Sequence, residues 1–277
     1  MFPRIDLHTH SDCSDGLLSP AALVALAVQR QVEMLALTDH DTISGCGQAG
    51  AACAQAAIRF VPGVELSCQW REREIHIVGL RLDVTDAALL SHCAAVLERR
   101  RERISAMTSR LSRAGLPGEQ LAALTLEAAL PTRTHLARAL CRLGLADSLQ
   151  QAFERYLKRG RPGYVSAQWP QLASAVERIV AAGGIAVLAH PHRYSLSHGV
   201  LRELVAEFKA AGGEGIEVSL SGMGPADAER AAALARRYEL AGSIGSDFHE
   251  PDLPWRPLGR FAKLPDLITP IAARLVP

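Results

Sequence analysis

Short apolar runs alternate with alanine-rich amphipathic segments over the first 85 residues of the chain. Ser19-Pro20 has the sequence of a helix N-cap followed by proline at the first helical position, so we expect a helix to begin there. In chain order, the pattern predicts a helix from residue 20, a strand over 34–38, a helix over 46–57, and strands over 58–65 and 75–80.

The same alternation resumes after residue 165. Pro170 and Pro225 are expected to open two helices of this part. The predicted elements are helices over 170–182, 199–212, 225–240 and 264–275, and strands over 184–189, 215–218 and 240–246. Because strands alternate with helices on both sides of a middle section, the sequence predicts an α/β protein with a parallel sheet or barrel.

The middle section, residues 86–164, has a helical pattern without a convincing strand. Pro117-Gly118 and Leu130-Pro131 break its helices, and the charged run 98–103 is typical of a solvated helix face. The section ends in the basic, glycine-containing stretch 156–165, which suits either a loop that closes over a phosphate or an ordinary surface linker. We therefore expect a barrel domain built from 1–85 and 165–277, with 86–164 as an inserted, substrate-capping helical subdomain.

Composition narrows the class of protein. The chain has 277 residues, of which 48% are hydrophobic, and a formal net charge of +1, so binding of an anion must depend on local charge. We expect no signal peptide, because Arg4 and Asp6 interrupt the opening, and no apolar run approaches the ~20 residues that a membrane span needs. The six cysteines are scattered without a CxxC pair, which favours reduced thiols and a cytoplasmic location.

Candidate chemistry starts at the first predicted strand. His8 and His10 are two residues apart, and side chains at that spacing on a strand point to the same face. Their nitrogens can therefore converge on one metal ion, and Asp15 could reach the same ion or a neighbouring one. Taken alone, the pair also fits two polar residues at a solvated strand end.

Ionisable residues lie in or just after most of the predicted strands. Seven of the ten histidines do so, and function in α/β folds collects where strands end. The candidate residues are His8, His10, Asp15, His40, Glu65, His76, His190, His192, Asp247 and His249. Because one catalytic ion takes about three or four protein ligands, this set predicts two or three ions. Bridged divalent ions of this kind hydrolyse phosphate esters with a bridging hydroxide as nucleophile, and Glu65 is the natural bridging carboxylate.

The ordered motifs DLHTHSDCSDG, LTDHDT, GVELS, HIVGL, AHPHR and GSDFH resemble the signature of the PHP (polymerase and histidinol phosphatase) superfamily. The resemblance spans the whole chain. It implies a distorted seven-stranded (β/α) TIM-like barrel, a trinuclear metal site and hydrolysis of phosphate esters.

The resemblance also implies how the ligands are shared among the ions. One ion would be held by His8, His10, Glu65 and Asp247, a second by Glu65, His76 and His190, and a third by Asp15, His40 and His249. Among these, the expected catalytic residues are His8, His10, Glu65, Asp247 and His249. His192 falls outside the usual ligand set and is expected to be a substrate contact or an alternative ligand. Manganese is the expected metal, with iron and zinc as alternatives that the same ligands accept.

The helical insertion resembles that of small stand-alone PHP phosphoesterases. This similarity implies a 3',5'-nucleotide bisphosphate phosphatase that converts pAp to AMP. The residues implied in gripping the substrate are Arg133, His135, Lys158, Arg161, Tyr164, His192 and Arg193. For His135 the alternative is a role in helix packing, and for Arg133 an exposed cation at a helix start. The expected partner is a small phosphorylated nucleotide or a short RNA, with no membrane and no obligate protein partner.

Four rival functions remain open from the sequence, and one of them is a histidinol-phosphate-type phosphatase. A 5'-to-3' exoribonuclease would use the same metals but would need aromatic side chains for stacking, and only 5% of the residues are aromatic. A metal-dependent amidohydrolase also carries an HxH pair on a barrel. A degenerate, non-catalytic PHP domain is disfavoured by the complete set of candidate ligands.

Overall fold

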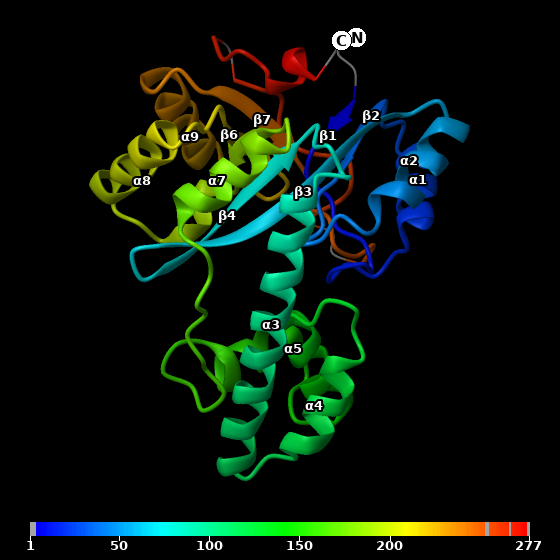
Figure 1. Cartoon of the computed structure of the whole chain (residues 1–277), viewed down its shortest axis with the longest axis vertical. Helices are drawn as coiled ribbons and strands as arrows, with labels where there is room; N and C mark the ends of the chain where they lie inside the picture. The colour runs from blue at the N-terminus through cyan, green and yellow to red at the C-terminus, as the bar shows by residue number, and fades with distance from the viewer. Residues whose placement is uncertain (1–3, 253–254, 266, 276–277) are drawn as a thin grey trace. The chain divides into compact units, whose positions relative to one another are not determined.

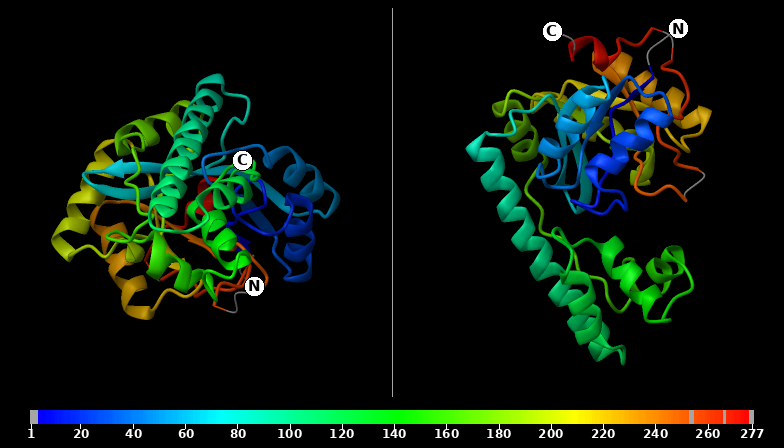
Figure 2. Two further views of the ribbon diagram at one scale, coloured as in Figure 1. Left: turned by 90° about the horizontal axis from the view of Figure 1, so that it is seen from below. Right: turned by 90° about the vertical axis from the view of Figure 1, so that its right-hand side faces the viewer.

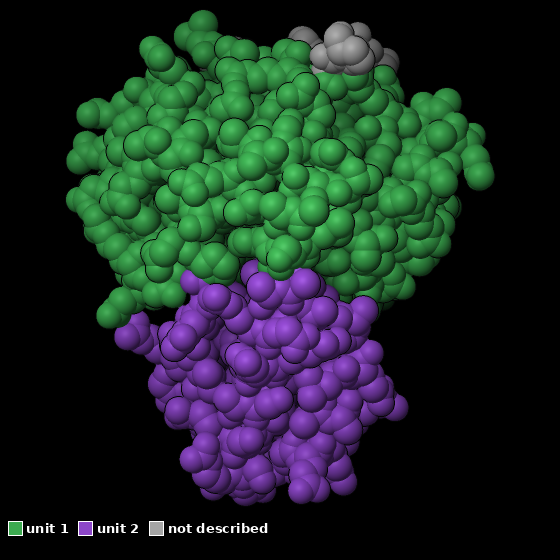
Figure 3. Space-filling view, in the orientation of Figure 1, with its two compact units in different colours: residues 1–92, 170–277 green, residues 93–169 purple. Residues whose placement is uncertain are grey.

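The computed structural model describes residues 4–252, 255–265 and 267–275. The chain forms two compact units, which are coloured separately in Figure 3. The barrel unit comprises residues 1–92 and 170–277, and the helical unit comprises residues 93–169.

The barrel unit contains one seven-stranded sheet in the order β1 to β7 (Figure 1). Its strands are β1 (Ile5–Asp6), β2 (Met34–Leu37), β3 (Arg59–Trp70), β4 (Arg73–Leu80), β5 (Ile185–Leu188), β6 (Gly215–Leu220) and β7 (Ala241–Gly245). Backbone hydrogen bonds connect the first and last strand segments. Leu7 N donates to Ile244 O at 3.2 Å, and Asp247 N donates to His8 O at 2.8 Å. The sheet thus closes on itself, which confirms the predicted α/β barrel.

The expectation of an all-parallel arrangement is wrong at β4. This strand runs antiparallel to both β3 and β5, whereas the other neighbouring pairs are parallel. Only Arg71 and Glu72 separate β3 from β4, and a parallel crossover needs a dozen or more residues. Arg71 has the positive φ of 53° that such a tight turn can require. The two strands therefore form a hairpin, which distorts the barrel.

Among the described residues, five α-helices lie wholly within this unit (Figures 1 and 2). They are α1 (Pro20–Gln29), α2 (Cys46–Gln55), α7 (Leu172–Ala181), α8 (His198–Ala210) and α9 (Pro225–Arg237). The predicted cap of α1 is confirmed, because the Ser19 side chain accepts from Ala22 N at 3.3 Å. His198, which reads as a loop residue from the sequence, is the first residue of α8.

The strand β2 shows how the barrel unit is packed. All four of its residues are buried, but alternate side chains enter different clusters. Met34 and Ala36 join one apolar cluster with side chains of other strands, such as Val187. Leu35 and Leu37 join a second cluster with the inner faces of α1 and α2. The strand is therefore apolar throughout because both of its faces are covered.

The helical unit has its own core. It contains most of α3 (Ala87–Arg113) together with α4 (Gly118–Leu126), α5 (Arg133–Arg142), α6 (Leu149–Ala152) and a π-helical turn (Phe153–Leu157). Leu111, Leu121, Leu136, Leu140 and Leu157 are fully buried in one apolar cluster of this unit. This segment is helical as predicted, without a strand.

The helix predicted over 264–275 is wrong for the described residues of that range. Only a short 3-10 turn, Ile271–Arg274, forms there, and residue 266 and residues beyond 275 lie outside the described part. Pro265 and Pro270 explain the difference, because proline lacks an N–H and its ring clashes with the preceding helical turn.

Candidate metal centre

Most of the candidate ligands are placed where strands of the barrel end. His8 and His10 follow β1, His40 follows β2, and His190 follows β5. Glu65 and His76 lie within β3 and β4, where these strands pass the same end of the barrel. Asp247 and His249 follow β7. All of these residues except His190, together with Asp15, form three overlapping groups, and the potential ligand atoms of each group lie within 4.8 Å of one another.

The first group consists of His8, His10, Glu65 and Asp247, all of them buried. The Nε2 atoms of the two histidines are 3.1 Å apart. Glu65 Oε2 lies 3.4 Å from each of these nitrogens, and Asp247 Oδ1 lies 3.4 Å from His8 and 3.2 Å from His10. Such separations match those of atoms that share one ion, ~3.0–3.4 Å for ligands about 2.1 Å from the metal.

The second group surrounds the carboxylate of Glu65. Its Oε1 atom lies 3.0 Å from His76 Nδ1 and 2.8 Å from His190 Nε2. Its Oε2 atom lies 2.9 Å from His40 Nδ1. The ligand group formed here is His40, Glu65 and His76, and His190 adjoins it through Glu65. One buried carboxylate therefore faces the histidines of more than one group, as a bridging ligand does.

The third group consists of His10, Asp15, His40 and His249. Asp15 Oδ1 lies 3.3 Å from His249 Nε2 and 3.8 Å from His40 Nε2. The rings of His10 and His249 stack with centroids 4.1 Å apart. His10 thus belongs to two groups, which motif matching alone does not indicate.

Burial and the neighbouring charges divide the histidines into two kinds. Burial lowers the pKa of His10 to about 3 and that of His190 to about 4, so both are neutral at pH 7. Burial opposes the charge on His76 and His249 as well, but carboxylates outweigh it. Glu65 and Glu74 raise the pKa of His76 to about 10, and Asp15 and Asp247 raise that of His249 to about 9.

The carboxylates remain ionised at the centre despite their burial. Desolvation raises the pKa of Glu65, but His40 and His76 hold it well below its ordinary value. Asp247 is likewise held low, chiefly by Arg193 and His8 against the effect of burial. Negative oxygens and neutral imidazoles therefore lie side by side.

Two buried atoms show that this donor set fits metal ions. Glu65 Oε2 and His40 Nδ1 are buried and lie 2.9 Å apart, yet neither makes a hydrogen bond among the described residues. Buried polar atoms without a hydrogen bond are costly unless an ion or water satisfies them. Nitrogen and oxygen donors in this proportion suit manganese, iron and zinc.

Glu217 is a supporting residue that the sequence analysis missed. Its Oε1 atom lies 2.7 Å from His8 Nδ1, and its Oε2 atom accepts from His190 N at 2.5 Å. A carboxylate on the far nitrogen of a ligating histidine fixes the ring and its tautomer. The sequence feature that could have indicated this role is an acidic residue in the middle of a mostly apolar strand, β6, which is wholly buried.

The aspartates near the motifs stabilise loops. Asp39 accepts from Ser11 N at 2.7 Å and from the Ser14 hydroxyl at 2.6 Å, and Asp41 accepts from Ser67 N at 2.6 Å. These bonds hold the loops that follow β1 and β2 and the strand β3.

Two arginines reach the centre beside Asp247. Arg193 pairs with Asp247 Oδ2, and Arg256 Nη1 lies 3.2 Å from the same oxygen. Arg256, which the sequence analysis also missed, comes from the segment after the last motif. Burial and Arg193 lower the pKa of His192 to about 4, so this ring is neutral.

The other expected substrate residues lie in the helical unit. His135 forms a capping box at the start of α5, where its Nδ1 accepts from Thr132 N at 3.2 Å. Arg133 lies over the Phe153 ring with its guanidinium carbon 6.0 Å from the centroid. Lys158 pairs with an acid one helical turn earlier at 3.7 Å. The remaining two are Arg161, which is exposed, and Tyr164, which is half-buried.

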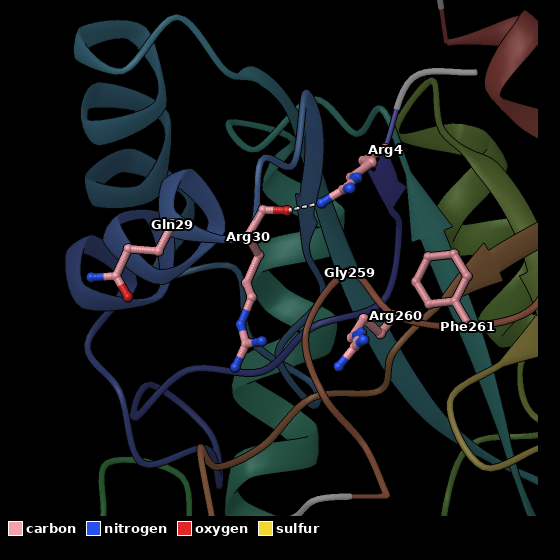
Figure 4. A pocket seen from close by; sticks show the side chains of 6 residues that line it. All are labelled: Arg4, Gln29, Arg30, Gly259, Arg260 and Phe261. Atoms are coloured by element: carbon pink, nitrogen blue, oxygen red, sulfur yellow. Dashed lines mark hydrogen bonds between the residues drawn. The ribbon is translucent and has the colours of Figure 1, made fainter. Parts of the chain in front are cut away.

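A separate hollow in the barrel unit is lined by Arg4, Gln29, Arg30, Gly259, Arg260 and Phe261 (Figure 4). Arg4 Nη1 donates to Arg30 O at 3.0 Å across it. Arg4 immediately precedes β1, whereas His8 follows that strand, so the hollow and the candidate ligands belong to opposite ends of β1. None of the candidate ligands lines it.

Comparison with known proteins agrees with this geometry. Residues 6–166 match the model of the PHP domain family. The chain is 43% identical to the 5'-3' exoribonuclease Rnm of Escherichia coli K12, over 94% of this chain and 89% of that protein. It is 41% identical to the 3',5'-nucleoside bisphosphate phosphatase of Chromobacterium violaceum, over 97% and 95% of the two chains. A solved structure of an amidohydrolase from Chromobacterium violaceum with bound sulfate superposes with a TM-score of 0.93 at 40% identity, covering 98% and 95%.

Within the described ranges, no helix is both long and apolar enough to cross a bilayer.

Proposed function

The chain belongs to the PHP domain family of metal-dependent phosphoesterases, and on that premise we propose that it hydrolyses the 3'-phosphate of 3',5'-nucleotide bisphosphates, converting pAp to AMP and phosphate. The main support is the convergence of buried imidazole and carboxylate donors around Glu65. The similarity to a relative named for this activity, over nearly the whole of both chains, supports the choice of substrate.

We propose that two or three divalent ions, manganese in the first place, are held by these donors. The proposed ligands are His8, His10, Asp15, His40, Glu65, His76, His190, Asp247 and His249. Such ions activate water as a nucleophile and stabilise charge on the phosphoryl oxygens.

The protein's own contribution is to position the ligands and the substrate. Glu217 holds the His8 ring, and Glu65 spans the ligand groups. Arg193 and Arg256 place two guanidinium groups beside Asp247, where a phosphate oxygen would find a bidentate partner. We propose His192, and the residues of 86–164 expected from the sequence (Arg133, His135, Lys158, Arg161 and Tyr164), as further substrate contacts.

A 5'-to-3' exoribonuclease is the second candidate. The charge of the helical unit supports it, because residues 93–169 carry thirteen Lys and Arg against six Asp and Glu. A polynucleotide presents many phosphates to such a surface, whereas pAp presents two. The similarity to Rnm supports the same choice.

The deciding experiment measures product release by manganese-reconstituted protein on pAp, histidinol phosphate and a 5'-phosphorylated RNA oligonucleotide. Dominant turnover of pAp supports the phosphatase, and progressive release of mononucleotides from RNA with slow pAp turnover supports the nuclease. Asp247→Asn should lower either activity about a hundredfold or more, while the exposed Asp252→Asn control should retain it. No product from any substrate, with metal bound, would refute the proposed activity.

A further inference from the structure

The charge of this chain is distributed unevenly between its two units. The whole chain has a formal net charge of +1, but the helical unit alone carries +7. The barrel unit is correspondingly acidic, at −6. A local excess of this size attracts a polyanion even though the net charge of the molecule does not.

Part of the excess gathers at the end of α3. Arg110, Arg113, Ala114 and Pro162 line a hollow in the surface of the helical unit. Arg110 Nε donates to Pro162 O at 3.0 Å, so the α3 end and the loop after Leu157 are joined there. We call the exposed cations Arg110 and Arg113, with Ala114 and Pro162, the α3-end patch.

The two arginines keep most of their hydrogen-bonding capacity. Arg113 uses its Nε to reach Ser109 O at 3.4 Å, and Arg110 uses its Nε as described above. Among the described residues, neither guanidinium has a carboxylate partner, and no acidic residue lines the hollow. Both side chains are exposed, and their Nη groups make no hydrogen bond within the described chain.

We propose that the α3-end patch binds the phosphodiester backbone of single-stranded RNA. The inference rests on the proposed function, in its exoribonuclease form, for the identity of the strand. Arginine pairs bidentately with phosphate, and an open, exposed hollow admits a continuous strand. No aromatic side chain lines the hollow, so we expect contacts with phosphates and little preference for base sequence.

The test measures binding of a 5'-phosphorylated RNA, labelled at its 3' end, by fluorescence anisotropy at several salt concentrations. The full chain is used with a chelator so that the RNA is not cleaved. Each phosphate contact on a single strand adds ~0.7 to the magnitude of the slope of log K, the binding constant, against the logarithm of the salt concentration. The double variant Arg110→Ala/Arg113→Ala should therefore lower the slope by about 1.4 and weaken binding about 25-fold at ~0.1 M salt.

Three further measurements make the result specific. Arg110→Lys/Arg113→Lys keeps the charges and should keep the slope. Arg30→Ala/Arg260→Ala removes two arginines from the hollow of the barrel unit and should leave RNA binding unchanged. Hydrolysis of pAp by the Arg110→Ala/Arg113→Ala variant with manganese should equal that of the wild type.

Several outcomes would overturn the inference. Unchanged RNA affinity and slope in the Arg110→Ala/Arg113→Ala variant would do so, as would an equal loss in the Arg30→Ala/Arg260→Ala control. Competition by inorganic phosphate as strong as that by RNA would show a site for a single anion. RNA binding is measured without metal, and catalysis is measured with manganese, so the two results are independent. Absence of catalysis by the wild type would refute the proposed function, whereas only the binding data decide whether the α3-end patch holds RNA.

Discussion

Glu217 provides the sharpest test of how the barrel prepares its ligands, and the informative change is Glu217→Gln. The carboxylate is 1% exposed and faces two donors, the His8 ring nitrogen at 2.7 Å and His190 N at 2.5 Å. Glutamine has the same shape, but only one of its two terminal atoms accepts a hydrogen bond. While His8 Nδ1 carries its proton, either orientation of the amide replaces one of the two hydrogen bonds by a contact between two donors.

The expected magnitude follows from that count. With the amide oxygen towards His190 N, the His8 Nδ1 atom must accept, which puts the proton on Nε2, the nitrogen that faces Glu65 and Asp247. Metal binding at Nε2 must then move the proton back to Nδ1. There the Nδ1–H group faces the NH2 group of the glutamine, so two buried donors meet without an acceptor, at a cost of ~1–3 kcal/mol. This corresponds to a metal affinity weakened by about 10- to 100-fold, which is the range for losing the partner of a ligating histidine.

The assay is calorimetric titration of metal-depleted protein with manganese, with circular dichroism to confirm the fold. Glu214→Gln is the matched control, because Glu214 lies just before β6 and pairs with Arg274 at 2.6 Å on the partly exposed surface. We expect its metal affinity to equal that of the wild type. An equal affinity in the folded Glu217→Gln variant would refute the positioning role of Glu217.

Three other perturbations have defined outcomes. Asp247→Asn removes an anionic oxygen that lies within 3.4 Å of both His8 and His10, and should lower phosphate release about a hundredfold or more, measured at saturating manganese; near-wild-type turnover would contradict it. The pKa values of His76 and His249, about 10 and about 9, exceed the ordinary 6.5, so their stabilisation is present below pH 6.5 and is lost as pH rises through these values. Urea unfolding of metal-depleted protein should therefore give a free energy that falls from pH 7 to pH 10, and a constant value would be inconsistent with this. Ser19→Ala removes the cap of α1 and should lower the free energy of unfolding by about 1 kcal/mol, whereas an unchanged urea midpoint would show that the cap is dispensable.

Local patterns predicted most of the elements because they depend on neighbouring residues. The cap and proline that begin α1, and the apolar strand β2, are each visible within a short window of sequence. The errors arose where distant parts of the chain decide. The turn at Arg71-Glu72 carries no glycine or asparagine signal, so the β3–β4 hairpin was not expected. Glu217 lies within a buried strand, and its role is visible only once β6 is placed beside His8 and His190.

By itself, the sequence determined the class of the fold and the donors of the candidate metal centre. Strand periodicity alone puts His8 and His10 on one face, and most of the other donors lie at or near the predicted ends of strands. Only the tertiary structure decided which donors meet. Glu65 faces histidines that are 11 to 125 residues away in sequence. His10 belongs to two groups because closure of the barrel between β1 and β7 brings Asp247 and His249 to the first strand. Such contacts depend on long-range strand pairing, which no local pattern of residues records.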